Sequence, residues 1–345
     1  MMFPTEPDRW TLDIATAGRV EAVAAFGVTE RQAQFLVHAL LHAGVFVERQ
    51  YCQFAHIVHG QKSADFVRML VERRWATPVA TGPLHRGRLF HLHYKPLWAA
   101  IGEPDNRFRK ATTHGRLIER VMLLDAVLDE PDLSWLGPAI DKRRHFQRAL
   151  AGRLDLRAFP HLTFHGDGGT TSRLFPDKLP IGVEPHGRRH VLLYLVTGPS
   201  AMDFRLFLLR HTELLRALYQ WEIRLLVPRP LVAATTAYLR AARDHLASPL
   251  DPAVIDELKW FFPEQERLAQ PGAGAPDARL LRDRSAYRAP QFTALYRHWL
   301  VARNDAFWCA GSPTLADAID RGEGQVECVP LTRQYLHLSN LVGVA

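Results

Sequence analysis

The strongest structural signal in the sequence lies in one stretch of four consecutive parts: KSADFVRMLVERR (residues 62–74), WATPVA (residues 75–80), TGPLHRGR (residues 81–88) and LFHLH (residues 89–93). In its first part, Phe66 and Leu70 recur at helical spacing, and we expect Lys62, Arg68 and Arg73 to point to solvent. The second and fourth parts have the apolar character of short strands, and the Gly-rich basic part between them is typical of a turn. The stretch therefore predicts a helix followed by a two-stranded hairpin with a basic tip.

Two more helices precede this stretch and one follows it. Thr29 is a helix N-cap candidate, and an apolar stripe at helical spacing runs from there to Gly44, which we expect to end the first helix. A second helix is predicted over residues 48–58, and a closing helix over residues 94–101. Three helices, a strand, a turn and a returning strand in this order predict a winged helix over residues 29–102.

A winged helix reads DNA with its third helix in the major groove, while the hairpin tip contacts phosphates or the minor groove. The same fold also serves in protein–protein contacts, and an exposed charged helix face is often only solvated. We favour DNA because a basic tip follows the third helix at the correct distance. The DNA-binding candidates in this module are Lys62, Ser63, Arg68, Arg73, His85, Arg86 and Arg88.

Four segments are expected along the chain: an N-terminal helical arm (1–28), the winged helix (29–102), a basic helical linker (103–150) and an α/β domain (151–345). The arm is expected to pack on the winged helix or on a second copy of the chain. In the linker, Arg107, Arg109 and Lys110 are further DNA-binding candidates, because they could follow a phosphate backbone. A solvated connector explains them equally well.

The α/β segment is expected to hold a sheet with helices around it. Strands are predicted over residues 161–165, 170–183, 190–196, 222–227, 307–310 and 326–330. Helices are predicted over residues 117–128 and 138–150 in the linker, and over residues 203–220, 231–246, 251–268 and 290–304 in the α/β segment. The overall fold class is thus α+β or α/β.

Composition bounds the function more weakly than the motifs do. The net charge is +7, and arginine supplies most of the positive charge, which suits phosphate and guanine recognition but also follows from a GC-rich genome. Three scattered cysteines without a CxxC pair argue against disulfides and cysteine zinc sites, and favour a reducing compartment. Without a secretory leader or an apolar span, we expect a cytoplasmic, nucleoid-associated protein with no membrane partner.

The helix, three strands, helix and strand predicted between residues 138 and 228 have the order of a restriction-endonuclease-like core. Together with the N-terminal module, LLDAVL (residues 123–128) and TTSRLFPDKLPI (residues 170–181) resemble the replication-relaxation family of bacterial mobile elements. The resemblance covers roughly residues 29–230. It implies a winged helix joined to a nuclease-like α/β domain, with DNA as the partner.

Nucleases of that fold need an acid at the second strand and an acid and a lysine on the third, to hold Mg²⁺ and position the attacking water. Asp177 stands where the first acid belongs, but the strand at residues 191–196 (VLLYLV) has neither acid nor lysine. We therefore expect Asp177 and Lys178 to form a structural pair and the domain to be a non-catalytic scaffold. The alternative is a Mg-dependent nuclease in which Asp177 works with Glu184 or Glu222.

Histidine is abundant, and His91 and His93 share one face of their predicted strand. A zinc site there would need further ligands, so we expect no metal and no cofactor. The sequence as a whole favours a double-stranded DNA-binding protein, a transcriptional regulator or accessory factor of a bacterial mobile element. A homodimer would read a two-fold symmetric site. A Mg-dependent nuclease and a protein-interaction adaptor are the alternatives.

Overall fold

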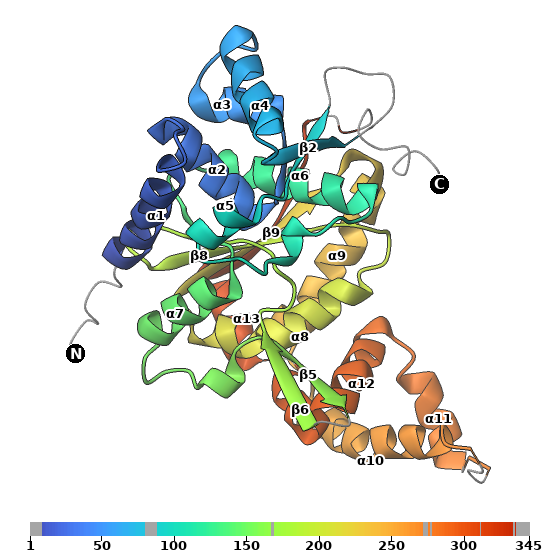
Figure 1. Cartoon of the computed structure of the whole chain (residues 1–345). Helices are drawn as coiled ribbons and strands as arrows, with labels where there is room; N and C mark the ends of the chain where they lie inside the picture. Colours follow the sequence, from blue (N-terminus) through green and yellow to red (C-terminus); the bar gives the residue numbers. More distant parts are fainter. Residues whose placement is uncertain are drawn as a thin grey trace.

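The computed structural model describes residues 9–79, 88–166, 169–271, 275–276, 278–310, 312–333 and 335. It is a mixed α+β structure (Figure 1). Its α-helices are α1 (Arg9–Ala24), α2 (Glu30–His42), α3 (Glu48–Ala55), α4 (Gln61–Glu72), α5 (Lys95–Ala100), α6 (His114–Leu128), α7 (Ala139–Ala149), α8 (Met202–Ala217), α9 (Thr235–Ala242), α10 (Pro252–Leu268), α11 (Ala278–Ala286), α12 (Pro290–Ala302) and α13 (Pro313–Asp320). Its strands are β1 (Val45–Val47), β2 (Ala76–Val79), β3 (Leu89–Leu92), β4 (Ser134–Leu136), β5 (His161–Gly166), β6 (Gly169–Leu174), β7 (Ile181–Val183), β8 (Arg189–Leu195), β9 (Gln220–Val227) and β10 (Gly324–Pro330).

The N-terminal helices begin and end where local chemistry places them. Thr29 caps α2 by accepting a hydrogen bond from the Gln32 amide, and the Gln32 side chain accepts one from the Thr29 amide. After α2, Gly44 adopts φ of +68°, and a Cβ there would lie 2.6 Å from Cβ of Phe108. Both the backbone angle and the close approach therefore require glycine at this position.

The strands of the N-terminal module form a small antiparallel sheet in the order β1-β3-β2. In its register, Phe46 lies opposite Phe90, and Pro78 lies opposite Phe90 from the other side. The order of elements is thus α2, β1, α3, α4 and the hairpin β2–β3. The helices predicted over residues 62–74 and 94–101 are present as α4 and α5.

A five-stranded mixed sheet forms the centre of the molecule, in the order β10-β9-β8-β7-β4. Strands β4, β7 and β8 are antiparallel neighbours, whereas β8, β9 and β10 run parallel. The α8 helix joins β8 to β9, as a parallel connection requires.

Alternate side chains of β8 enter two different cores, because successive residues of a strand point to opposite faces. Val191 and Leu193 pack in an N-terminal core with α2 and α6, whereas Leu192 and Tyr194 pack in a second core with α8. The N-terminal core contains residues from α1 through β8. It therefore includes residues on both sides of the segment boundaries predicted at 102–103 and 150–151. The N-terminal module thus covers one face of the sheet (Figure 1).

The third core lies away from the sheet, at the lower end of Figure 1. Its helices α10, α11 and α12 pack around Phe262 and Trp299, and Leu209 of α8 joins them to the rest of the molecule. The hairpin β5–β6 lies beside α12 in Figure 1 and pairs only with itself.

Two sequence predictions in this part are wrong, and β4, α11 and α13 were not predicted. The strand predicted over residues 170–183 is two strands in different sheets, because Phe175 and Lys178 between them adopt φ of +45° and +55°. Residues 307–310 belong mainly to a 3-10 helix (Arg303–Cys309) rather than to a strand. The short strand β4 pairs with β7 at the sheet edge.

Candidate nucleic-acid interface

The α4 helix buries one face and exposes the other. Phe66, Val67 and Leu70 are buried in the N-terminal core, whereas Lys62 and Arg68 are exposed. The amphipathic pattern in the sequence therefore places these two cations correctly on the solvent side. A helix laid in a DNA groove needs such an exposed polar face.

Ser63 does not belong to that exposed face. Its side chain is fully buried, accepts a hydrogen bond from the Gly60 amide at 3.1 Å and donates one to the Gly60 carbonyl at 2.9 Å. Serine at the third position of a helix can cap the preceding backbone in this way, so the prediction that Ser63 faces DNA is wrong. Ser63 is therefore removed from the candidate contacts.

The exposed cations of α4 differ in how firmly they are held. Arg68 donates to Asp65 at 2.8 Å, an exposed pair one helical turn apart that is worth well under about 1 kcal/mol. Arg73 donates to the Phe26 carbonyl at 2.9 Å and lies over the Trp75 ring. Within the described part of the chain, Lys62 has no ion-pair or hydrogen-bond partner. Lys62 and Arg68 are thus free to meet a ligand at little cost.

A groove of about 370 Å³ runs between α4 and the hairpin β2–β3. Arg68 and Arg88 line it, and so do two acids, Glu48 and Glu72. Glu48 is held by His59, whose Nε2 lies 3.1 Å from its carboxylate. Arg88 is exposed at the start of β3, whereas the other predicted tip residues, His85 and Arg86, lie outside the described residues.

The basic linker is fastened to the N-terminal module. Asn106 caps a 3-10 turn (Arg107–Arg109) by accepting from the Phe108 amide at 2.9 Å, and the Phe108 carbonyl contacts His91 Nε2 of β3 at 2.8 Å. Arg109 donates to the Pro104 carbonyl at 3.2 Å. Arg107 and Lys110 are exposed at the ends of this turn. The linker therefore has one fixed position relative to β3.

A buried carboxylate fixes α3, the helix that supports α4. Asp125 of α6 accepts two hydrogen bonds from the Arg49 guanidinium, each at 2.7 Å, and one from Gln50 at 2.9 Å. Tyr335, near the C-terminal end, donates to the same carboxylate. Its neighbour Arg333 donates to Asp129 at 2.6 Å. Both α3 and the segment after β10 are thus bound to α6.

The expected nuclease residue Asp177 is occupied by a different partner. Arg210 of α8 donates to Asp177 at 2.6 Å, so Asp177 is not paired with Lys178. The nearby Lys142 of α7 is buried and donates to the Leu179 carbonyl at 2.5 Å. Burial lowers the pKa of Lys142 to about 7, opposed by Asp177 and Asp141. The space among these side chains is about 10 Å³, which is too small for a hydrated metal ion.

The other acids considered for a metal site lie elsewhere. In the β8–β9 register Glu222 lies opposite Val191, so both are on the face of the central sheet that packs in the N-terminal core. Asp177 pairs with Arg210 of α8, on the opposite face of the sheet. Arg189 and Arg224 both donate to the Glu222 carboxylate and lower its pKa, against the opposing effect of burial. Across the described residues, no group of three or more His, Cys, Asp or Glu side chains is arranged to hold a metal ion.

The histidines of the hairpin are engaged singly. His93 Nε2 lies 2.7 Å from the Thr77 hydroxyl, and His91 is bound to the linker as described above. Their rings are 6.3 Å apart, and neither is positioned with a third ligand. Deep in the second core, His145 and His190 contact each other through Nε2 atoms 2.9 Å apart, and burial lowers the pKa of both.

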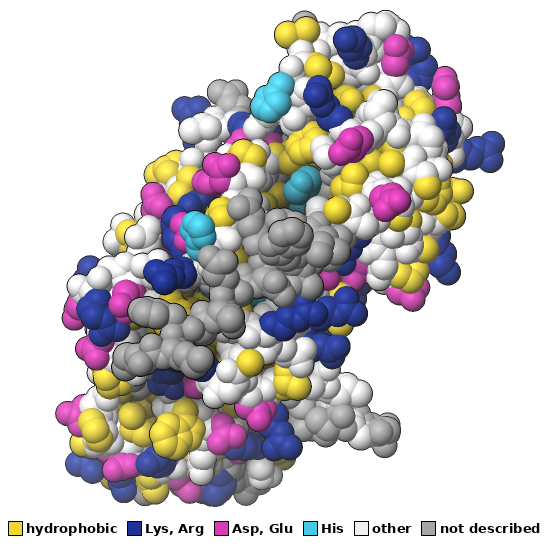
Figure 2. Space-filling model, turned by 90° about the vertical axis from the view of Figure 1, so that its left-hand side faces the viewer, with side chains coloured by type: hydrophobic (Ala, Val, Ile, Leu, Met, Phe, Trp, Pro, Cys, Tyr) yellow, Lys and Arg dark blue, Asp and Glu magenta, His cyan; other side chains and the backbone are white. Residues whose placement is uncertain are grey.

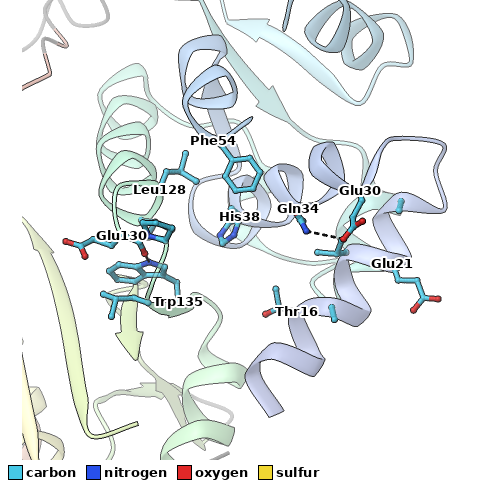
Figure 3. A pocket seen from close by; sticks show the side chains of 15 residues that line it. Thr16, Glu21, Glu30, Gln34, His38, Phe54, Leu128, Glu130 and Trp135 are labelled. Carbon is cyan, nitrogen blue, oxygen red and sulfur yellow. Dashed lines mark hydrogen bonds between the residues drawn. The ribbon is translucent and has the colours of Figure 1, made fainter. Parts of the chain in front are cut away.

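A cavity of about 700 Å³ lies between α1, α2 and the segment after α6 (Figure 3). Phe54, Leu128 and Trp135 give it apolar walls, and Glu30 and Glu130 stand on its rim. His38 points into it, and burial lowers the pKa of this histidine to about 4. The cavity therefore presents a neutral imidazole among apolar side chains.

Figure 2 shows the left-hand side of the molecule as it is drawn in Figure 1, and acidic and basic side chains are interspersed over this face. The net positive charge is thus not spread as one uniform field on this face.

No protein-family model, no curated protein and no solved structure matches this chain. None of the helices in the described ranges is long and apolar enough to span a lipid bilayer.

Proposed function

We propose that this chain binds double-stranded DNA through a winged helix made of α2, β1, α3, α4 and the hairpin β2–β3. The observation that carries the proposal is the element order together with the β1-β3-β2 sheet, in which an exposed face of α4 adjoins the hairpin. In winged helices this arrangement places the third helix in the major groove.

The chemistry of the α4 face fits a groove that offers phosphates at its edges and base edges at its floor. Lys62 and Arg68 supply cationic donors, and Gln61 supplies an amide that can both donate and accept. Asp65 and Glu72 on the same face repel phosphates. This mixture favours selective binding over uniformly strong binding, because the two carboxylates repel any duplex that places phosphates beside them.

The remainder of the chain supports the module in this proposal. The order α6, β4, β7, β8, α8, β9 is that of a restriction-endonuclease-like core, with residues 137–180 as an insertion between its first two strands. We take α6, instead of the helix over residues 138–150, as its first helix. The plan agrees with the resemblance to the replication-relaxation family, so we propose a non-catalytic scaffold and a role as regulator or accessory factor of a mobile element.

The test is fluorescence anisotropy with duplexes recovered from fragmented genomic DNA by pull-down and sequencing. Arg68→Ala is compared with Arg267→Ala on α10, which removes an arginine of similar exposure that also pairs with an acid three residues earlier. We expect Arg68→Ala to weaken binding about five-fold or more and to lower the salt slope by about 1, while Arg267→Ala changes neither.

Two outcomes would overturn the proposal. If no duplex is retained in a salt-dependent manner, the adaptor alternative replaces it. If Arg68→Ala and Lys62→Ala both bind as tightly as the wild-type chain, α4 is not the reading surface.

A further inference from the structure

A second cavity, of about 390 Å³, lies where the linker, the start of α7 and the end of β6 meet. Three cationic side chains from separate segments line it: Arg107 from the linker, Arg173 from β6 and Lys178 from the segment that leads to β7. Arg107 and Arg173 lie 66 positions apart in the sequence, so only the fold brings them together.

The positive charges around this cavity are not neutralised by ion pairs. Within the described ranges, no carboxylate lies in ion-pair contact with Arg107, Arg173 or Lys178. Lys178 instead lies over the Phe108 ring, 4.8 Å from its centroid, and Arg120 of α6 contacts the same ring at 4.5 Å. Two cations therefore lie against this one aromatic ring.

The mutual repulsion of these groups is visible at Lys178. Burial and, after it, the neighbouring charges of Arg173, Arg107 and Arg120 together lower the pKa of Lys178 to about 8. Glu103 on the cavity wall opposes them, and burial raises the pKa of that carboxyl group. Asp105, the other acid of the lining, is exposed. The balance at the cavity stays positive.

Backbone donors add to the cations. The first residues of α7, an eleven-residue helix, line the cavity, and its N-cap is Pro138, which supplies no capping hydrogen bond. The free amides of the first turn and the helix dipole favour an anion at this position. The one acid of that turn, Asp141, is neutralised by two hydrogen bonds from Arg19 at 2.8 and 2.9 Å.

We propose that this cavity binds a phosphate group, held by Arg107, Arg173 and Lys178 together with the first-turn amides of α7. Guanidinium groups bind phosphate oxygens in pairs, and a phosphate would relieve the repulsion among the cations. A cavity of this volume accepts inorganic phosphate or a nucleotide. The phosphate comes either from a free nucleotide or from a DNA backbone, and the site does not depend on the surface of α4.

Isothermal titration with inorganic phosphate, at constant ionic strength set by chloride, tests the proposal. We expect saturable binding by the full-length protein, weakened about ten-fold or more in Arg173→Met and in Lys178→Met. The control Arg157→Met removes an exposed arginine outside the cavity and leaves the affinity unchanged. Circular dichroism establishes that each variant is folded.

Absence of phosphate binding to the wild-type chain would overturn the proposal. Unchanged affinity in both folded cavity variants would do the same.

A competition experiment then identifies the source of the phosphate. If a duplex that binds the chain displaces phosphate, and Lys178→Met also weakens the duplex, the cavity holds a backbone phosphate. If the duplex and phosphate bind independently, or if the chain binds phosphate and no duplex, the ligand is a free phosphate compound. The last result would refute DNA binding through α4 while leaving the phosphate site intact.

Discussion

Neutralising Asp125 is expected to destabilise the protein far more than neutralising Asp129, one turn further along the same helix. Asp125 is buried and accepts hydrogen bonds from Arg49, Gln50 and Tyr335. In Asp125→Asn, an amide NH₂ replaces one of the accepting oxygens and faces donors. The Arg49 guanidinium then loses its counter-charge in a largely buried setting.

The size of the effect follows from the exposure of the partners. Removing one partner of a buried ion pair costs about 3–5 kcal/mol, and the Arg49 side chain keeps 36% of its exposure, so we place the cost near about 3 kcal/mol. With an entropy of unfolding of about 2.1 cal/mol/K per residue, a chain of 345 residues that melts as one unit loses about 4 °C.

Asp129→Asn is the matched control. Asp129 also pairs with an arginine, but its side chain is 40% exposed, and such pairs contribute less than about 1 kcal/mol. Asp129 also caps the C-terminal end of α6, where a negative charge is unfavourable, which reduces the loss further. Differential scanning calorimetry of both variants measures the difference. Equal destabilisation by the two substitutions would contradict this expectation.

Three further predictions concern the core and the proposed scaffold. Because the pKa of Lys142 falls from 10.5 to about 7 on folding, the unfolded chain binds more protons than the folded chain between these pH values, and stability rises with pH across that window. Lys142→Met should therefore stabilise the protein at pH 7 in urea unfolding, with a gain that shrinks toward about pH 10. A gain that is independent of pH would contradict this. Gly44→Ala should lower the melting temperature, because its Cβ would lie 2.6 Å from Cβ of Phe108. Gly18→Ala, at a helix position with open space around it, should raise the melting temperature slightly. The reverse order of the two melting temperatures would contradict the packing argument. Plasmid incubated with Mg²⁺ or Mn²⁺ should stay intact, because Arg210 holds Asp177, and cleavage that Asp177→Asn abolishes would overturn this expectation.

Local signals in the sequence located most of the helices. The capping box at Thr29 and the apolar spacing of Phe66 and Leu70 determine where α2 and α4 lie, and both signals act within a few residues. The exposure of Lys62 and Arg68 followed from the same spacing. The burial of Ser63 did not, because a capping serine and an exposed serine look alike in a sequence.

Such local signals could not predict contacts between residues that lie far apart in the sequence. The segment at residues 170–183 has the composition of one strand, and only the turn conformations at Phe175 and Lys178 divide it between two sheets. Strand β4 has three residues, too few for any periodicity, and exists because β7 pairs with it. The partner of Asp177 is 33 positions away on α8.

The proposed phosphate site shows the same limit. Arg107 was predicted as a linker cation that contacts phosphate, whereas Lys178 was predicted only as a partner of Asp177 and Arg173 was not singled out. The three side chains meet because the chain turns after β6, where the sequence predicted one continuous strand over residues 170–183. A charge cluster assembled from four segments becomes visible only in three dimensions.

The hydrogen bonds from Arg333 and Tyr335 to residues of α3 and of α6 and its C-cap have a consequence for biosynthesis. A ribosome releases residues 30–128 long before it reaches position 335, so the nascent module first folds without these contacts. The N-terminal helices therefore reach their final packing only after residues 333–335 have been synthesised, so the early segment depends on the later one.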